Sequence, residues 1–132
     1  MAGGQSDNDK RQPLWSNGGY NTQSELYVFM KAVVGARKQM IGVGDDTNFD
    51  VLVADDGARV FAFVRGSTVV VTSISGGGGE QTANFAASRL PSPMQPDGTK
   101  LCDTLSSGST YVSNGNVAIK LENGLPGLYT KC

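Results

Sequence analysis

A polar stretch near the N-terminus combines the side chains best suited to chemistry. It reads SDNDKRQPLW over residues 6–15 and holds acids, amides, bases and the only tryptophan of the chain. The order of its acids is like the start of a calcium-binding loop, but Arg11 and Gln12 stand where such a loop has a further acid and a glycine. The residue types therefore favour two other interpretations, a solvated tail or part of a binding site.

The rest of the chain offers few candidates for catalysis. It has no histidine, which excludes Ser-His-Asp and Cys-His catalysis and the zinc sites that use histidine. Glycoside hydrolysis needs two opposed carboxylates, whereas the acids at 45–46 and 55–56 are adjacent in the sequence. Asp103 lies in an expected strand, at a position that alternation directs to solvent. We therefore predict no catalytic residue, no metal site and no cofactor.

The composition is that of one small β-rich domain. The 132 residues suit a single domain, and the 18 glycines cluster between short apolar runs. Lys plus Arg number 11 and Asp plus Glu number 12, so a net charge of -1 provides no basic field for nucleic acid or an anionic membrane. No apolar run approaches membrane-spanning length, and the polar N-terminal residues predict no signal peptide.

Residues 22–42 predict one amphipathic helix, which follows a polar loop at 1–21. Thr22 and Glu25 match a capping box at the start of the helix, and Gly42 ends it. A lone helix with a wide apolar face must bury that face against the rest of the chain, a second copy or a missing domain. Self-association is one expected outcome, through Leu26, Phe29, Met30 and Val33.

A C-terminal β-sandwich domain is predicted over residues 43–132, because from residue 45 on the hydrophobic period changes from that of a helix to two. Turn pairs such as Asn114-Gly115 and Asn123-Gly124 separate the short apolar runs. The pattern is typical of a mainly β fold, an antiparallel Greek-key β-sandwich of about eight strands. The expected strands are residues 49–55, 58–66, 67–75, 80–88, 99–105, 109–113, 116–122 and 128–132.

The chain has two cysteines, so only one intramolecular disulfide is possible, between Cys102 and Cys132. The alternative is two unrelated buried thiols. We favour the disulfide, because Cys132 is the last residue and a terminal strand gains from a covalent link. Such a bond stabilises a fold by roughly 3–4 kcal/mol and indicates an oxidising, extracellular compartment.

Two groups of motifs extend over nearly all of the chain. The loop GGQSDNDKRQPLW precedes a helix that begins Ser-Glu-Leu-Tyr at residues 24–27 and contains Arg37. The segments DGARVFAFVRGSTVVVTSIS and SNGNVAIKLENGLPGLYTKC follow, the second with a Gly-Leu-Pro turn at 124–126. In this order they resemble the last barrel loop and helix, and then the C-terminal β-sandwich, of fungal members of the α-amylase family of glycoside hydrolases.

The resemblance implies roles for residues in the N-terminal loop. Asp7 and Arg11 match family residues that reach toward sugar hydroxyls, and a carboxylate with a guanidinium suits a polyol. The loop departs from the family by one extra residue before Asp7, by the missing proline after it, and by Lys10 in place of asparagine. For Trp15 we slightly favour packing before the helix over contact with a sugar. The candidates for stacking on a sugar are Trp15, Tyr20 and Tyr111.

The resemblance also implies what the chain does. The family's catalytic carboxylates and calcium ligands lie on earlier barrel strands, so we expect no starch hydrolysis from this chain alone. We expect a secreted, non-catalytic C-terminal portion of a starch-degrading enzyme, with weak affinity for α-glucan or another carbohydrate. The alternative is a secreted fungal interaction protein of the immunomodulatory type, which acts through its surface, as a dimer in one form of the hypothesis.

Overall fold

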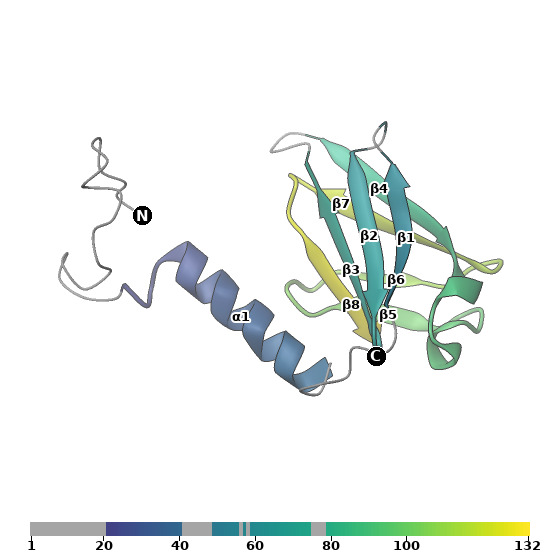
Figure 1. Ribbon diagram of the computed structural model, residues 1–132, viewed down its shortest axis with the longest axis horizontal. Helices are drawn as coiled ribbons and strands as arrows, with labels where there is room; N and C mark the ends of the chain where they lie inside the picture. The colour runs from purple at the N-terminus through teal and green to yellow at the C-terminus, as the bar shows by residue number, and fades with distance from the viewer. Residues whose placement is uncertain (1–20, 41–48, 56, 58, 75–78) are drawn as a thin grey trace. The chain divides into compact units, whose positions relative to one another are not determined.

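The residues that the structure describes form one α-helix followed by eight antiparallel strands, two short 3-10 helices lying between the fourth and the fifth strand. Figure 1 shows how these elements follow one another along the chain. The computed structural model describes residues 21–40, 49–55, 57, 59–74 and 79–132. The mainly β fold class predicted from the sequence is confirmed for these residues.

Helix α1 (Glu25–Met40) begins three residues after the predicted start. The Oγ atom of Ser24 accepts a hydrogen bond from the backbone N–H of Tyr27 at 3.3 Å, so Ser24 caps the helix in place of Thr22. The helix end predicted at residues 41 and 42 lies outside the described residues. Among the residues that the structure describes, no helix has the length and apolar character needed to cross a membrane.

The strands form two sheets. The larger sheet has the order β1-β2-β3-β8-β5-β6, and β4 pairs with β7 in the smaller one. Every strand pair is antiparallel, and the Greek-key connection stays a prediction. The strands are β1 (Phe49–Asp55), β2 (Val60–Arg65), β3 (Thr68–Ser73), β4 (Glu80–Ala86), β5 (Lys100–Asp103), β6 (Ser109–Tyr111), β7 (Asn116–Glu122) and β8 (Gly127–Lys131).

The core is built by alternate residues of both sheets. Strand β7 alternates strictly between exposed and buried positions, and its Val117, Ile119 and Leu121 belong to the core. The segment after β4 contains two short 3-10 helices, η2 (Ala87–Arg89) and η3 (Ser92–Met94), and η2 includes the last two residues of the strand predicted at 80–88. The core includes Ala87 of η2, Met94 of η3 and Leu90, which lies between the two short helices. The segment therefore closes the sandwich at one end.

One buried polar group in the strands has no partner. Thr68 is 1% exposed, and among the described residues its hydroxyl makes no hydrogen bond. Because a buried unsatisfied hydroxyl costs free energy, we expect Thr68→Val to raise the free energy of unfolding by about 1 kcal/mol. Thermal unfolding followed by circular dichroism measures this. Thr72→Val, at a half-buried site on the same strand, should shift stability by at most about 0.5 kcal/mol. A destabilised Thr68→Val would mean that the hydroxyl has a hydrogen-bond partner.

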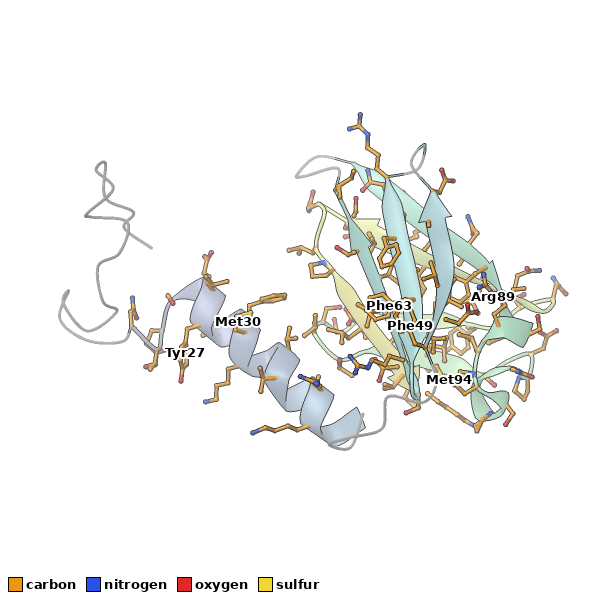
Figure 2. The ribbon with its side chains drawn as sticks, in the orientation of Figure 1. Tyr27, Met30, Phe49, Phe63, Arg89 and Met94 are labelled. Carbon is orange, nitrogen blue, oxygen red and sulfur yellow. A yellow bond between two sulfur atoms is a disulfide. The ribbon has the colours of Figure 1, made fainter. Side chains whose placement is uncertain are left out.

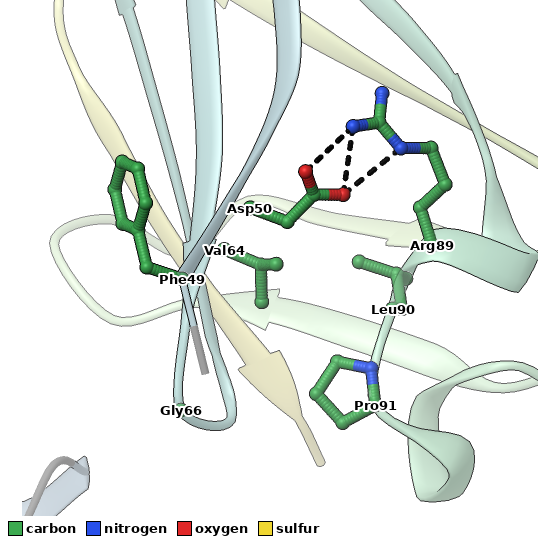
Figure 3. A pocket seen from close by; sticks show the side chains of 7 residues that line it. All are labelled: Phe49, Asp50, Val64, Gly66, Arg89, Leu90 and Pro91. Carbon is green, nitrogen blue, oxygen red and sulfur yellow. Dashed lines mark hydrogen bonds and ion pairs between the residues drawn. The ribbon is translucent and has the colours of Figure 1, made fainter. Parts of the chain in front are cut away.

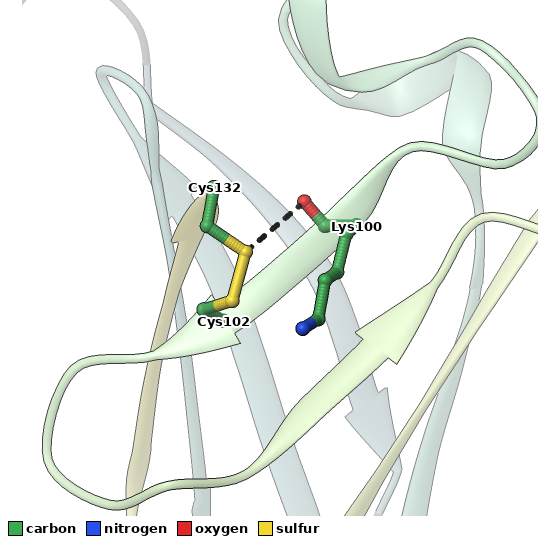
Figure 4. The surroundings of a disulfide bond; sticks show 3 residues. All are labelled: Lys100, Cys102 and Cys132. Carbon is green, nitrogen blue, oxygen red and sulfur yellow. Dashed lines mark hydrogen bonds between the residues drawn. A yellow bond between two sulfur atoms is a disulfide. The ribbon is translucent and has the colours of Figure 1, made fainter.

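The disulfide predicted from the cysteine count is confirmed. Cys102 and Cys132 are bonded, with their Cα atoms 5.8 Å apart (Figure 4). Strand β8 already pairs with β5 beside this link, and the N–H of Cys132 donates to the carbonyl of Lys100 at 3.2 Å. The bond therefore fixes Cys132 to β5, the strand next to the edge strand β6 of the larger sheet.

Candidate functional site

The structure describes one of the predicted sugar-contact residues. Asp7, Arg11, Trp15 and Tyr20 lie outside the described residues, so their roles stay predictions. Tyr111 is on β6, at the edge of the larger sheet, and its side chain is 54% exposed. It presents an aromatic surface to solvent, as stacking on a sugar requires.

A lysine accompanies the Tyr111 ring. Lys100 is paired with Tyr111 across β5 and β6, and its Nζ atom lies 6.0 Å from the centre of the ring. This is the distance of a weak cation–π contact. The pair offers one aromatic face and one hydrogen-bond donor, which together suit a hydroxylated ligand held with low affinity.

A pocket of about 280 Å³ lies at the other edge of the larger sheet (Figure 3). The Asp50 carboxylate and the Arg89 guanidinium face each other in one wall, from β1 and the end of η2. The Nε and Nη2 atoms of Arg89 donate to the two carboxylate oxygens at 2.9 and 2.7 Å. The other lining residues are Phe49, Val64, Gly66, Leu90 and Pro91.

Most of the hydrogen-bonding capacity of Arg89 is used within the fold. Its Nη2 atom also donates to the carbonyl of Val51 at 2.6 Å, and its Nη1 atom donates to the carbonyl of Leu52 at 3.1 Å. The strand register shifts here between Val51 and Val53, which marks a β-bulge in the edge strand β1. Arg89 therefore fastens the bulged edge strand to the segment that closes the sandwich, and we assign it a structural role.

Sequence reasoning missed this pair of residues. Asp50 and Arg89 are 39 positions apart, and neither belongs to a motif. The available signal was weak: Asp50 is a charged residue at the start of the apolar run FDVLVA. Only the fold brings η2 next to β1.

The prediction that Asp103 faces solvent is wrong. Its carboxylate is half-buried and accepts hydrogen bonds from the backbone N–H groups of Leu105 and Leu128, at 3.1 and 2.9 Å. It also accepts one from the hydroxyl of Ser106 at 2.6 Å. Strand β5 ends at Asp103, so its side chain turns into the following loop and joins that loop to β8.

Tyr129 is buried near this carboxylate. Burial raises the pKa of Tyr129 above its ordinary value of 10.0, and the negative charge of Asp103 raises it further. Above pH 10 the unfolded chain therefore loses this proton more readily than the folded chain does. The stability associated with the neutral phenol is full below that pH and is lost as the pH rises through the folded pKa.

We therefore expect Tyr129→Phe to reduce the loss of stability in alkaline solution. Urea unfolding at pH 8 and at about pH 11 should show a smaller decrease for the variant than for the unmodified chain. Tyr111→Phe is the control, because this tyrosine is exposed, and its decrease should match that of the unmodified chain. Equal decreases for all three proteins would contradict the assignment.

A row of aromatic side chains lies on the outer face of the larger sheet. Phe63 is at the centre, with its ring 5.5 Å from that of Phe49 and 5.7 Å from that of Phe61, measured between centroids. Figure 2 labels Phe49 and Phe63 on β1 and β2. The neighbouring Ala62 and Val64 point into the core, and Phe49 is 60% exposed. Exposed apolar surface of this kind is typical of sites that contact another molecule or domain.

The described residues contain no group of three or more His, Cys, Asp or Glu side chains placed to hold a metal ion. The carboxylates of Asp50 and Asp103 are both engaged in structural contacts. Asp97 likewise accepts a hydrogen bond from the N–H of Gly115 at 2.8 Å. These three acids therefore act within the fold.

No protein-family model matches the chain, and no curated protein sequence matches it. Several solved protein structures are similar to the chain. The α-amylase from Malbranchea cinnamomea is similar over 96% of this chain and 26% of its own, with a TM-score of 0.74 and 26% sequence identity.

Bacterial α-amylases share the fold. An Anoxybacillus α-amylase matches 100% of this chain and 26% of its own, with a TM-score of 0.65 and 17% identity. An α-amylase from Geobacillus thermoleovorans, solved with acarbose, matches 62% of this chain and 17% of its own, with a TM-score of 0.50 and 16% identity. The chain thus spans about a quarter of the length of the first two α-amylases. The chain is thus similar in fold to the C-terminal part of an α-amylase, and it shares 26% sequence identity with the Malbranchea cinnamomea enzyme.

Proposed function

We propose that the chain acts as the non-catalytic C-terminal portion of an α-amylase-like, starch-degrading enzyme and binds α-glucan weakly. The observation that carries the proposal is the likeness to the Malbranchea cinnamomea enzyme over 96% of this chain. The row of Phe49, Phe61 and Phe63, of which Phe49 and Phe61 are exposed, supports a place within a larger enzyme, because such apolar surfaces are usually covered.

A non-catalytic role is supported by the contacts of three of the described acids. The hydrogen bonds of Asp50, Asp97 and Asp103 hold them in the fold, so none is available as one of an opposed pair around a glycosidic bond. The disulfide between Cys102 and Cys132 supports secretion, since such bonds persist in oxidising compartments.

Weak α-glucan binding is supported by Tyr111 and Lys100. One exposed ring and one ammonium group give a small contact area, so we expect a dissociation constant in the millimolar range. For Asp7 and Arg11, which lie outside the described residues, the family resemblance gives the only argument for contact with a sugar.

Electrophoresis through native gels that contain soluble starch tests the proposal. The unmodified chain should be retarded, Tyr111→Ala should migrate freely, and Tyr27→Ala, an exposed tyrosine of the helix, should behave like the unmodified chain. A reducing-sugar assay should show no turnover. Migration independent of starch would reject glucan binding, and turnover would reject the non-catalytic role.

A second candidate function is interaction through the helix, and one observation favours it. Between residues 26 and 36 of α1 the only charged side chain is Lys31, so the helix is apolar around most of its circumference. Three of the predicted contact residues, Leu26, Phe29 and Met30, are exposed, while Val33 is half-buried.

Light scattering at several protein concentrations tests this candidate. For the chain without substitutions we expect a molar mass above that of one chain. For the double variant Leu26→Gln, Met30→Gln we expect the molar mass of a single chain. Lys31→Gln, on the polar side, should leave the mass unchanged. A strict monomer at every concentration would exclude self-association.

A further inference from the structure

Two Asn-Gly turns of the β-sandwich have nearly the same backbone conformation. Asn114 and Gly115 have φ angles of 51° and 70°, and Asn123 and Gly124 have φ angles of 54° and 69°. Positive φ at both central residues is the geometry of a type I′ turn. Both asparagines are exposed, so local shape and access to water are similar at the two sites.

An asparagine followed by glycine can modify itself. The backbone nitrogen of the glycine loses its proton and bonds to the side-chain carbonyl carbon of the asparagine, and the bond to the amide nitrogen breaks as ammonia leaves. Water then opens the five-membered ring at either carbonyl, giving aspartate or isoaspartate. Glycine favours this reaction because it has no Cβ atom to hinder the approach.

The attacking nitrogen is occupied in the first turn. The N–H of Gly115 donates to the Oδ1 atom of Asp97 at 2.8 Å. The carbonyl of Gly115 accepts from the N–H of Ala87 at 2.8 Å, which further fixes the turn. A nearby carboxylate also disfavours the anionic nitrogen that the reaction requires, because like charges repel. Reaction at Asn114 must therefore first break a charge-assisted hydrogen bond.

The second turn lacks these restraints. It is closed by one hydrogen bond, from the N–H of Leu125 to the carbonyl of Glu122 at 3.1 Å. Within the described part of the chain, the N–H of Gly124 has no hydrogen-bond partner. The nitrogen that would attack Asn123 is thus free to lose its proton.

We propose that Asn123 is a site of spontaneous deamidation and that Asp97 protects Asn114 from the same reaction. The product adds a carboxylate next to Glu122, which is already paired across the strands with Glu80. Like charges opposite one another destabilise a strand pair. Modification therefore loosens this end of the smaller sheet and makes the net charge one unit more negative than -1.

Peptide mapping tests the proposal on the intact chain. After incubation at mildly alkaline pH and reduction of the disulfide, trypsin releases Asn123 in the peptide 121–131 and Asn114 in the peptide 101–120. Tandem mass spectrometry distinguishes Asn114 from Asn116. We expect Asn123 to deamidate at least about tenfold faster than Asn114, the ratio that one charge-assisted hydrogen bond supports. The pair Asn17-Gly18 falls in another peptide, 12–31.

Two comparisons test whether the fold, and Asp97 in particular, causes the difference in deamidation rate between Asn114 and Asn123. In denaturant the two sites should react at similar rates, because both become unstructured Asn-Gly sequences. In the folded protein, Asp97→Ala should accelerate the reaction at Asn114, while Glu122→Gln should leave it unchanged. Equal deamidation rates at Asn114 and Asn123 in the folded chain without substitutions would overturn the proposal. So would an unchanged Asn114 rate in an Asp97→Ala variant whose circular dichroism spectrum is native.

Discussion

Removing the disulfide, as Cys102→Ala with Cys132→Ala, should lower the free energy of unfolding by about 3–4 kcal/mol. The bond closes a loop with a sequence separation of 30 residues, so its loss frees strands β5 to β8 in the unfolded chain. Because a small domain is stable by only about 5–15 kcal/mol, this is a large part of the total. Urea unfolding followed by circular dichroism gives the value.

Reduction of the unmodified chain provides the control for the double variant. A reducing agent should lower its unfolding midpoint to that of the variant and should leave the variant itself unaffected. A variant within about 1 kcal/mol of the unmodified chain would contradict the role assigned to the bond.

Replacing Arg89 should have the second-largest effect. We expect Arg89→Met to lower the free energy of unfolding by about 2–3 kcal/mol, because the carbonyls of Val51 and Leu52 and the carboxylate of Asp50 all lose their donor. The estimate allows for partial exposure, with the two charged side chains 40% and 47% accessible. Urea unfolding again measures the change.

Two further variants distinguish the effect of the planar guanidinium donors of Arg89 from the effect of its positive charge. Arg89→Lys keeps the positive charge but not the planar array of donors, so it should recover less than half of the loss. Lys120→Met breaks the exposed ion pair with Glu80, whose atoms are 3.7 Å apart, and should cost at most about 0.5 kcal/mol. If Arg89→Met were as mild as Lys120→Met, the account of Arg89 as a structural clamp would be wrong.

The strands were predictable because their hydrophobic period and turn residues are local. Strand β7 occupies the predicted residues, and the Asn-Gly turns at 114–115 and 123–124 adopt the positive φ angles that such pairs favour. The α-amylase resemblance drawn from the order of motifs is confirmed by the similarity to solved α-amylases.

Contacts that depend on the fold could not be predicted. The pairing of Asp50 with Arg89 needs η2 to lie beside β1, and no local pattern contains that information. In the run VFAFV at the start of β2 both sets of alternate residues are apolar, so the period alone could not say that Ala62 faces the core and Phe63 faces outward.

The most direct test of the account is a titration of the isotope-labelled chain with maltoheptaose, followed by nuclear magnetic resonance. We expect saturable shifts at millimolar ligand, centred on the amides of Tyr111 and Lys100, and no loss of ligand to hydrolysis. Spectra that stay unchanged at millimolar ligand would contradict α-glucan binding, and cleavage of the ligand would contradict the non-catalytic role.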